Sequence, residues 1–311
     1  MKKILVLGSL NMDFVIRMKD KPEIGETILG RDVELVPGGK GANQAYATGK
    51  LGGDVTMLGA VGDDGYGEKL IQNLQDVGVD TTGVQRLGIC STGQAFVSVY
   101  DSGDNSIVVI PGANGRISKK MIEQNKRYID ECDYILMQME IPLDIVKYVK
   151  ELGVKGGKKI ILDPAPAVPE LEDDFWKGIS LLKPNETELA VLTGQKVHGK
   201  EEVVKAAKSL VEKGVETVVV TLGGDGCILV NRDRVQCFPA NPVKCKDTTA
   251  AGDSFIGALV VALSEGKDYE NAIGFAQEVS SIVVTKRGAQ TSIPTRVEVE
   301  ERRKENETYN Y

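Results

Sequence analysis

The stretch YILMQMEIPLDIVKYVKELGVKGGKKIILDPAPA, residues 134–167, decides the fold class of this sequence. It contains two apolar runs, at 134–140 and 159–167, with a helical candidate at 142–152 between them. Continuous apolar runs are typical of strands covered on both faces, which occur mainly in parallel sheets. We therefore expect an α/β fold with a doubly wound, mostly parallel sheet flanked by helices. Further strand candidates lie at 4–9, 55–62, 180–186 and 217–224, and further helical candidates at 64–77, 185–193 and 201–213.

Two segments do not fit this alternation, and we expect them to form a small inserted β-sheet lid. Residues 12–35 and 82–110 show partial alternation of polar and apolar residues between turn signals, which suits strands with one exposed face. The main α/β domain would then comprise residues 1–11, 36–81 and 111–311. Its charged end, from residue 296, is expected to be solvated or frayed.

Composition and charge exclude several classes of protein. The 311 residues are 41% hydrophobic, which allows a large core, and their net charge of -7 argues against a nucleic-acid-binding or anionic-membrane surface. The apolar run at the N-terminus stops at Gly8-Ser9, so it is interpreted as a strand and not as a signal peptide. The five cysteines, an odd number without C-x-x-C spacing, are expected to be reduced thiols in a cytoplasm.

Polar and glycine-rich residues follow the predicted strands. In open parallel sheets, ligands bind beyond the carboxyl ends of the strands, so these residues could line one crevice. They are Asn11 and Asp13, Glu140, Asp163, Asn185, and Gly223-Gly224.

The segment KDTTAAGDSFIGAL, residues 246–259, combines a polar turn with the apolar face of a helix. Asp253 would lie in the first turn of that helix, where backbone N–H groups are unpaired and the helix dipole is positive. The small residues 250–252 would let an anion such as phosphate approach those N–H groups, with Asp253 beside it as a proton acceptor. The alternative is an ordinary capped helix.

A second glycine-rich segment, VPGGKGANQA at residues 36–45, matches neither of the common phosphate-binding patterns. Gly41 stands where a Walker A loop has Ser or Thr, and a G-x-G-x-x-G spacing is absent. A turn into a helix from about Lys40 to Leu51 remains, and it would present N–H groups, Lys40 and Asn43 to a hydroxyl-rich ligand. A purely structural turn is the alternative.

Together these motifs resemble the ribokinase/fructokinase family of sugar kinases along nearly the whole chain. The motifs that carry the resemblance are GSLNMDF, GETILG, VPGGKGANQAYATGKLGG, GAVGDDGYG, LMQMEIP, LDPAPA, KPNETE, VTLGGDG, DTTAAGDSFIGAL and TKRGAQTSIP. The resemblance implies a doubly wound α/β domain with a small β lid that often forms a dimer contact. A homodimer would then pair apolar lid residues such as Val15 and Ile28.

The resemblance also assigns roles to individual residues. It implies that Asp253 is the catalytic base and that Ala250, Ala251 and Gly252 form the anion hole. The implied sugar-binding residues are Asn11, Asp13, Gly39, Lys40, Asn43 and Glu140, and the implied ATP-binding residues are Asn185, Thr221, Gly223, Gly226 and Gln277. The implied ion sites are Asn185 and Glu188, through water, for Mg²⁺, and Asp247, Thr249, Gly288 and Ser292 for K⁺.

Two of these assignments have a specific weakness. Asn185 and Glu188 also fit a helix N-cap with a capping-box carboxylate, which needs no metal. Gln277 stands near the expected adenine, where His or Asn is frequent in the family, so base preference is open.

His198 is expected to be a surface loop residue, and as the only histidine it argues against a Ser-His-Asp hydrolase and a His-rich zinc site.

Three functions are consistent with the sequence. The first is ATP-dependent phosphorylation of D-ribose at its 5-hydroxyl, giving ribose 5-phosphate. The second is the same reaction on fructose, deoxyribose, 2-keto-3-deoxygluconate or a nucleoside. Selectivity among these acceptors depends on whether a buried polar group forms a hydrogen bond with each sugar hydroxyl, which a sequence does not show well. The third is a non-catalytic sugar- or nucleotide-binding protein on the same fold, which the presence of Asp253 argues against.

Overall fold

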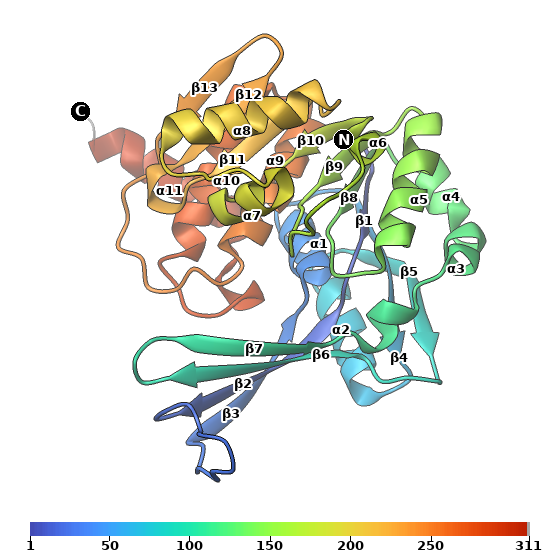
Figure 1. The fold of residues 1–311 in the computed structure, drawn as a ribbon, viewed down its shortest axis with the longest axis vertical. Helices are drawn as coiled ribbons and strands as arrows, with labels where there is room; N and C mark the ends of the chain where they lie inside the picture. Colours follow the sequence, from blue (N-terminus) through green and yellow to red (C-terminus); the bar gives the residue numbers. More distant parts are fainter. Residues whose placement is uncertain (310–311) are drawn as a thin grey trace.

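The computed structural model describes residues 1–309, and the side chains of residues 1–305. Two sheets organise the chain, a large one inside the main domain and a small one that projects from it as an arm (Figure 1). The order of the large sheet is β13-β12-β11-β10-β9-β8-β1-β4-β5, and that of the small sheet is β3-β2-β6-β7. We call the small sheet the lid.

The large sheet is parallel over seven strands and ends in an antiparallel hairpin at one edge. Strands β1 and β10 are buried throughout and β9 is buried except for its first residue, Lys159, which agrees with their continuous apolar sequences. The nine strands are β1 (Ile4–Leu7), β4 (Val55–Gly62), β5 (Asp80–Leu87), β8 (Tyr134–Met137), β9 (Lys159–Leu162), β10 (Ile179–Leu182), β11 (Thr217–Thr221), β12 (Cys227–Asn231) and β13 (Val235–Phe238).

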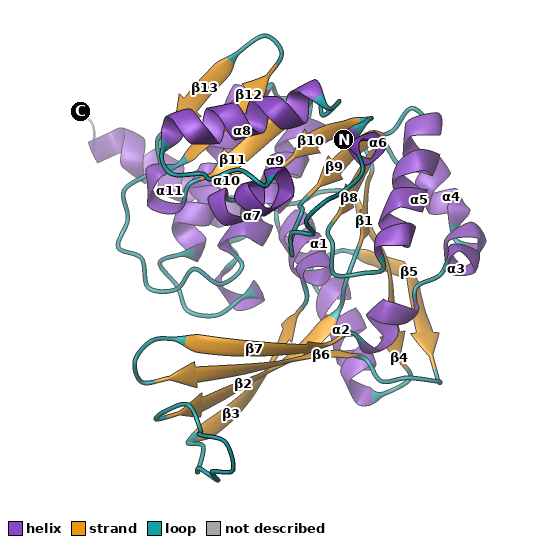
Figure 2. Cartoon of the chain, viewed as in Figure 1, coloured by secondary structure: helices purple, strands orange, loops and turns teal. Residues whose placement is uncertain are grey.

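Helices cover both faces of the large sheet and create two hydrophobic cores (Figure 2). One core lies beneath α1 (Lys40–Lys50), α2 (Gly65–Gln75), α9 (Ala251–Ser264), α10 (Tyr269–Val283) and α11 (Arg296–Tyr309). The other lies beneath α3 (Lys119–Gln124), α4 (Lys126–Glu131), α5 (Leu143–Lys155), α6 (Asp173–Trp176), α7 (Glu186–Thr193) and α8 (Lys200–Glu212). Three 3₁₀ turns complete the elements: η1 (Gly112–Arg116), η2 (Gly223–Asp225) and η3 (Gln290–Ser292). The predicted doubly wound α/β fold is therefore confirmed.

The lid consists of β2 (Asn11–Met18), β3 (Asp32–Gly38), β6 (Gly93–Tyr100) and β7 (Asn105–Ile110). The predicted second lid segment, residues 82–110, begins too early, because residues 82–87 belong to β5 of the large sheet. As the edge strand, β5 has one partner and alternates buried and exposed residues, so its sequence looks like that of a lid strand. The first lid strand begins at Asn11 and β3 extends to Gly38, so the lid also reaches slightly beyond 12–35.

The charged C-terminal segment is also more ordered than expected up to residue 309. It forms α11, which is anchored by buried Val299 and by Arg296, whose guanidinium pairs with Glu265 at the C-terminal end of α9. Residues 310–311 lie outside the described residues. Among the described residues, none of the helices combines the length and the apolar character that crossing a membrane requires.

Close packing of α1 against its neighbours positions the residues that begin this helix. A Cβ on Gly49 would lie 2.7 Å from the carbonyl oxygen of Val77, and one on Gly257 would lie 2.9 Å from the Cβ of Ala47. The second glycine therefore lets α9 approach α1 one turn after Asp253. The starts of the two helices consequently lie side by side.

Candidate active site

A cavity of about 640 Å³ lies at the carboxyl ends of the parallel strands. This is where the topology of an open parallel sheet places ligands. Thirteen of the residues predicted from the sequence line it: Lys40, Asp163, Asn185, Glu188, Thr221, Gly223, Gly224, Gly226, Ala250, Ala251, Gly252, Asp253 and Gln277. The structure thus brings together the predicted base, the predicted anion hole and the predicted nucleotide-side residues.

The N-terminus of α9 opens into this cavity. Ala250 caps the helix in the left-handed conformation, with φ 58°, and the N–H of Ser254 donates to its carbonyl oxygen. The N–H of Ala251 donates to the carbonyl oxygen of Thr248 at 3.1 Å, so this predicted anion-hole amide is already engaged. Within residues 1–309, the amides of Ala250, Gly252 and Asp253 donate to no protein acceptor. These three amides can face a phosphate group.

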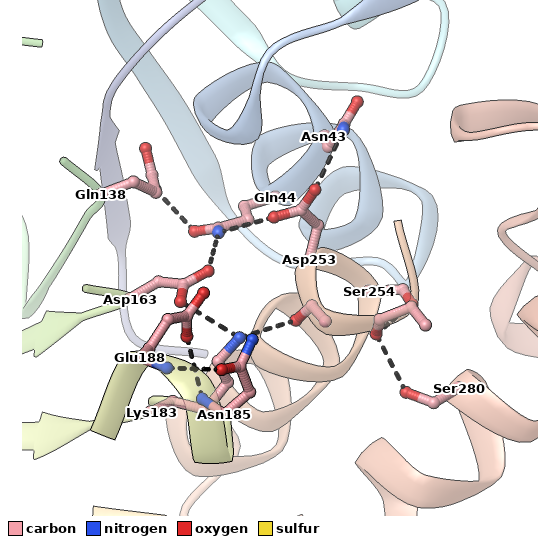
Figure 3. Close-up of polar contacts among 12 residues, drawn as sticks. Asn43, Gln44, Gln138, Asp163, Lys183, Asn185, Glu188, Asp253, Ser254 and Ser280 are labelled. Carbon is pink, nitrogen blue, oxygen red and sulfur yellow. Dashed lines mark hydrogen bonds and ion pairs between the residues drawn. The ribbon is translucent and has the colours of Figure 1, made fainter. Parts of the chain in front are cut away.

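The carboxylate of Asp253 lies beside those amides and is only 6% exposed. Each of its oxygens accepts one hydrogen bond from an amide of α1 (Figure 3). Asn43 Nδ2 donates to Oδ2 at 3.0 Å, and Gln44 Nε2 donates to Oδ1 at 2.9 Å. The nearby Asp253 raises the pKa of the Lys40 ammonium above its usual range, although burial acts in the opposite direction. Lys40 is therefore a fixed positive charge beside the carboxylate.

A buried ion pair forms part of the lining of the cavity. Lys183 Nζ is 3.1 Å from Asp163 Oδ1, and both side chains are almost completely buried. Burial raises the pKa of Asp163, whereas Lys183 and Lys40 lower it. Gln44 Nε2 donates to the other carboxylate oxygen of Asp163 at 2.7 Å. Asp163 is thus linked through one amide to Asp253.

The predicted sugar-binding residues form a second cluster, where β2 and the start of α1 meet the end of β8. Glu140 accepts hydrogen bonds from Ser9 Oγ at 2.5 Å and from the N–H of Lys40 at 3.0 Å. Asn114 Nδ2 donates to Asn11 Oδ1 at 2.8 Å, which turns the Asn11 amide so that its nitrogen is free to donate. Gly39 is the N-cap residue of α1.

Asp13 is the least satisfied member of this cluster. Its Oδ1 is buried and accepts no hydrogen bond from the described residues. Burial, followed by repulsion from Glu140 and Asp253, raises the pKa of Asp13 to about 7. A buried acceptor without a donor is rare in proteins and fits a site that is completed by a ligand hydroxyl.

Asn185 and Glu188 form the capping box that the sequence suggested as the alternative to a metal site. Asn185 Oδ1 accepts from the N–H of Glu188 at 2.7 Å, and Glu188 Oε2 accepts from the N–H of Asn185 at 2.9 Å. Burial, followed by repulsion from Asp163, raises the pKa of Glu188. The capping box occupies one oxygen of each side chain, so Glu188 Oε1 can still hold water on a metal ion.

The residues predicted to bind K⁺ lie in two loops behind the anion hole and do not line the cavity. Asp247 joins these loops, because its Oδ1 accepts from the N–H and Oγ1 of Thr249 and its Oδ2 accepts from the N–H of Gly288 at 3.0 Å. Ser292 Oγ donates to the carbonyl oxygen of Ala289. The described residues contain no cluster of three or more His, Cys, Asp or Glu side chains suited to a metal. A cation here would depend on carbonyl and hydroxyl oxygens.

Gln277 makes contacts other than those expected, and His198 lies outside the site. Gln277 Nε2 donates to the carbonyl oxygens of Phe238 and Pro239, both at 3.1 Å, so its amide nitrogen holds a loop on the rim of the cavity. His198 is exposed in the loop before α8, as expected.

Several buried polar residues of the site were missed as site residues from the sequence. They are Gln44, Gln138, Lys183, Asn114 and Gln290. Asp163 was expected in the crevice, where it lies, but the sequence assigned it no role. The available signal for Gln44 was its position next to Asn43 at the start of a helix, but two adjacent amides do not reveal a shared partner 209 residues away.

The chain is similar over nearly its whole length to known sugar kinases. Residues 1–296 match the model of the pfkB family carbohydrate kinases. The chain is 41% identical over 297 residues to a ribokinase of Haemophilus influenzae, covering 96% of this chain and 97% of that protein. It is 37% identical over 292 residues to a deoxyribokinase of Salmonella typhi, covering 94% and 95%. Among solved structures, it is similar to an Arabidopsis thaliana ribokinase complexed with ribose and ATP, with a TM-score of 0.90, 32% identity, and 96% and 98% of the two chains covered.

Proposed function

The chain belongs to the pfkB family of carbohydrate kinases, and we propose that it transfers the terminal phosphoryl group of ATP to the 5-hydroxyl of D-ribose, giving ribose 5-phosphate. Membership of the family means that it is a phosphotransferase acting on a sugar hydroxyl. The ribokinase at 41% identity and the ribokinase bound to ribose and ATP support ribose as the acceptor.

The observation that carries this proposal is the position of Asp253 beside three unengaged amides of α9. Asp253 accepts the proton of the sugar hydroxyl while the hydroxyl oxygen forms a bond to the terminal phosphorus of ATP and the bond from that phosphorus to the leaving ADP oxygen breaks. The amides of Ala250, Gly252 and Asp253 receive the developing charge on the transferred group. A non-catalytic binding protein would need no base at this place.

The predicted sugar-binding residues offer donors and acceptors that suit a hydroxyl-rich ligand. Asp13 and Glu140 offer carboxylate acceptors, and Asn11 offers an amide donor whose direction is fixed by Asn114. A ligand hydroxyl could donate to the Oδ1 of Asp13, which is buried and accepts no hydrogen bond from the described residues.

We also propose two ions. Asn185 and Glu188 would hold Mg²⁺ through water, and the ion would neutralise charge on the phosphate oxygens. Carbonyl and hydroxyl oxygens around Asp247, Thr249, Gly288 and Ser292 would hold K⁺ and so stiffen the loop that carries the anion hole.

The test is a panel of sugars supplied with ATP and Mg²⁺, with and without K⁺. Ribose should give the highest kcat/KM, and omission of K⁺ should lower it. Deoxyribose is the main competitor because of the deoxyribokinase at 37% identity, and a kcat/KM far above that of ribose would replace the proposed acceptor. Absence of turnover with every sugar, together with tight binding of sugar or nucleotide, would support the non-catalytic alternative.

We further propose that the lid forms a homodimer contact. Val15 and Ile28, named from the sequence, are half-buried, but the edge strand β7 exposes four consecutive apolar residues, Ile107–Ile110. An exposed apolar edge is a surface that proteins normally cover. Analytical ultracentrifugation should give a dimer that Ile107→Asp with Val109→Asp dissociates. A wild-type monomer with full activity in dilute solution would contradict the contact.

The proposed compartment is the cytoplasm. All five cysteines are free thiols in the structure, which agrees with the reducing environment expected from their number and spacing.

A further inference from the structure

We propose that Gln44 is the positioning residue of the base Asp253, and that Gln138 sets the direction in which the Gln44 amide donates. This inference rests on the proposed kinase function, because it concerns how the base is held for proton transfer. Neither glutamine lines the cavity or is needed to contact a substrate.

Gln44 lies between two carboxylates. Its Nε2 donates to Asp163 Oδ2 at 2.7 Å and to Asp253 Oδ1 at 2.9 Å, so both hydrogens of this amide group are used (Figure 3). The side chain is completely buried. Exchange of its nitrogen and oxygen would place a carbonyl oxygen against two carboxylate oxygens with no hydrogen between them. The two carboxylates therefore determine the direction of the Gln44 amide.

Gln138 reinforces that direction from the other side. Its Nε2 donates to Gln44 Oε1 at 2.5 Å. Its own carbonyl oxygen is buried and accepts no hydrogen bond from the described residues, so the protein leaves one polar atom unsatisfied in this arrangement. Such an atom in a native structure calls for an explanation. The explanation is that Gln138 must present its Nε2 to Gln44 Oε1. If the nitrogen and oxygen of the Gln138 amide were exchanged, two carbonyl oxygens would face each other and Gln44 would lose this donor.

Asp163 provides the fixed end of this network. It is held by Lys183, whose Nζ lies 3.1 Å from its Oδ1, and it follows the buried strand β9. The network therefore runs from a rigid strand of the large sheet through Gln44 to the base on α9. It restrains rotation of the Asp253 carboxylate about its side-chain axis, so that the second lone pairs of its oxygens remain directed at the substrate hydroxyl.

Four charged side chains on other elements lie near Asp253. They are Lys40 on α1, Asp13 on β2, Asp163 after β9 and Lys183 after β10. These charges act on Asp253 from several directions, whereas the Gln44 hydrogen bond acts on one oxygen from one direction and so restrains the orientation of the carboxylate.

The experiment compares wild type with Gln44→Met, Gln44→Glu and Gln138→Met. Gln44→Met keeps the length of the side chain and removes both donors, so we expect kcat to fall by about tenfold to a hundredfold while the KM values for sugar and ATP change by less than about threefold. Gln44→Glu should be the more severe, and Gln138→Met should show the same changes in weaker form.

The matched control is Gln195→Met. Gln195 Nε2 donates to Ser209 Oγ between α7 and α8, so this variant loses one amide hydrogen bond outside the site. It should leave kcat and the KM values for sugar and ATP unchanged. If Gln44→Met keeps kcat within about threefold of wild type, or if its loss appears mainly in KM, the positioning role is wrong. If Gln44→Met does not fold, Gln138→Met decides by the same criteria.

A crystal structure of the decisive variant separates this inference from the proposed function. Asp253 should show a rotated or doubly oriented carboxylate in the variant and a single orientation in wild type, whether or not any sugar is phosphorylated. Wild type without turnover would remove the kinase proposal, whereas an unmoved Asp253 in the variant would remove the role of Gln44.

Discussion

Two carboxylates in neighbouring regions of the site, Asp253 and Asp13, differ in how far the protein itself satisfies them. Both oxygens of Asp253 accept amide hydrogen bonds from α1, which packs closely against α9 in the core. Asp13 lies on β2 of the lid, and its buried Oδ1 accepts no hydrogen bond among residues 1–309. The protein therefore supplies a donor to each oxygen of the catalytic base, whereas it leaves one oxygen of Asp13 to be met by the substrate.

The difference has an energetic consequence. A preorganised base loses little conformational freedom during the reaction, so its environment contributes mainly to kcat. An unsatisfied buried carboxylate destabilises the free protein and gains hydrogen bonds on binding, so it contributes mainly to affinity for the sugar. Variants of the two aspartates should consequently affect different kinetic constants.

The largest expected effect is that of Asp253→Asn. This variant should lower kcat by roughly 10² to 10⁴, because the amide cannot accept the proton of the sugar hydroxyl. Binding of sugar and ADP, measured by calorimetry, should change little. Unfolding should occur within a few degrees of wild type, since only one hydrogen bond, to Asn43 or to Gln44, is replaced by a contact between two donors. Normal turnover would show that Asp253 is not the base and would end the comparison.

Asp13→Asn should weaken sugar binding by about tenfold to a hundredfold, the usual contribution of a hydrogen bond to a charged group. It should change kcat much less than Asp253→Asn does. The same variant should be more stable than wild type at pH 8. In the folded protein the pKa of Asp13 is raised from 3.8 to about 7, so the folded state binds the proton more tightly and stability decreases as the pH rises through this window. Replacement by Asn removes that loss.

The matched control is Asp20→Asn, which changes an exposed carboxylate of the lid whose side chain is 77% accessible. It should alter neither sugar affinity nor the pH dependence of stability. A variant of Asp13 that is less stable than wild type at pH 8 would mean that Asp13 is satisfied in the free protein, and the contrast with Asp253 would disappear.

The pH dependence of binding should show the same contrast. Because the pKa of Asp13 is about 7 in the free protein, this side chain is mostly protonated at pH 6 and mostly ionised at pH 8. Hydroxyl donors favour the ionised form, so sugar affinity should be about tenfold lower at pH 6 than at pH 8 and binding near pH 7 should release a proton. Calorimetry in buffers with different ionisation enthalpies measures that release. Release that persists in Asp13→Asn would assign it to another group.

The sequence predicted the parts of this site that depend on local patterns. Alternating apolar runs and helical periodicity identified the parallel sheet, and the turn before an apolar helix identified the position of Asp253. The pattern was ambiguous where a strand has only one neighbour, so the edge strand β5 was partly assigned to the lid. The β12–β13 hairpin was also not predicted.

Contacts between distant segments were not predictable in the same way. Gln44 and Asp253 meet because two glycines bring α1 close to its neighbours, and a single sequence does not show which helices pack together. Nor does it show that Asp13 remains unsatisfied, because this depends on every donor within reach of its oxygen. The sequence therefore indicated the chemistry of the site but not the network that holds the base.

The smallest expected effect on activity is that of Gly49→Ala, which tests whether the start of α1 is independent of its far end. Alanine favours a helix by about 1 kcal/mol over glycine. Its Cβ, however, would lie 2.7 Å from the carbonyl oxygen of Val77 and 2.8 Å from Val79 Cγ2, and a backbone atom cannot easily move away. We expect a net loss of about 1–2 kcal/mol in the free energy of unfolding, measured by denaturant titration. Asn43 and Gln44 lie more than a turn away, so kcat and KM should change by less than about twofold. A parallel fall in kcat would show that the geometry of the base depends on the whole of α1, and that the preorganised region is larger than the network around Asp253.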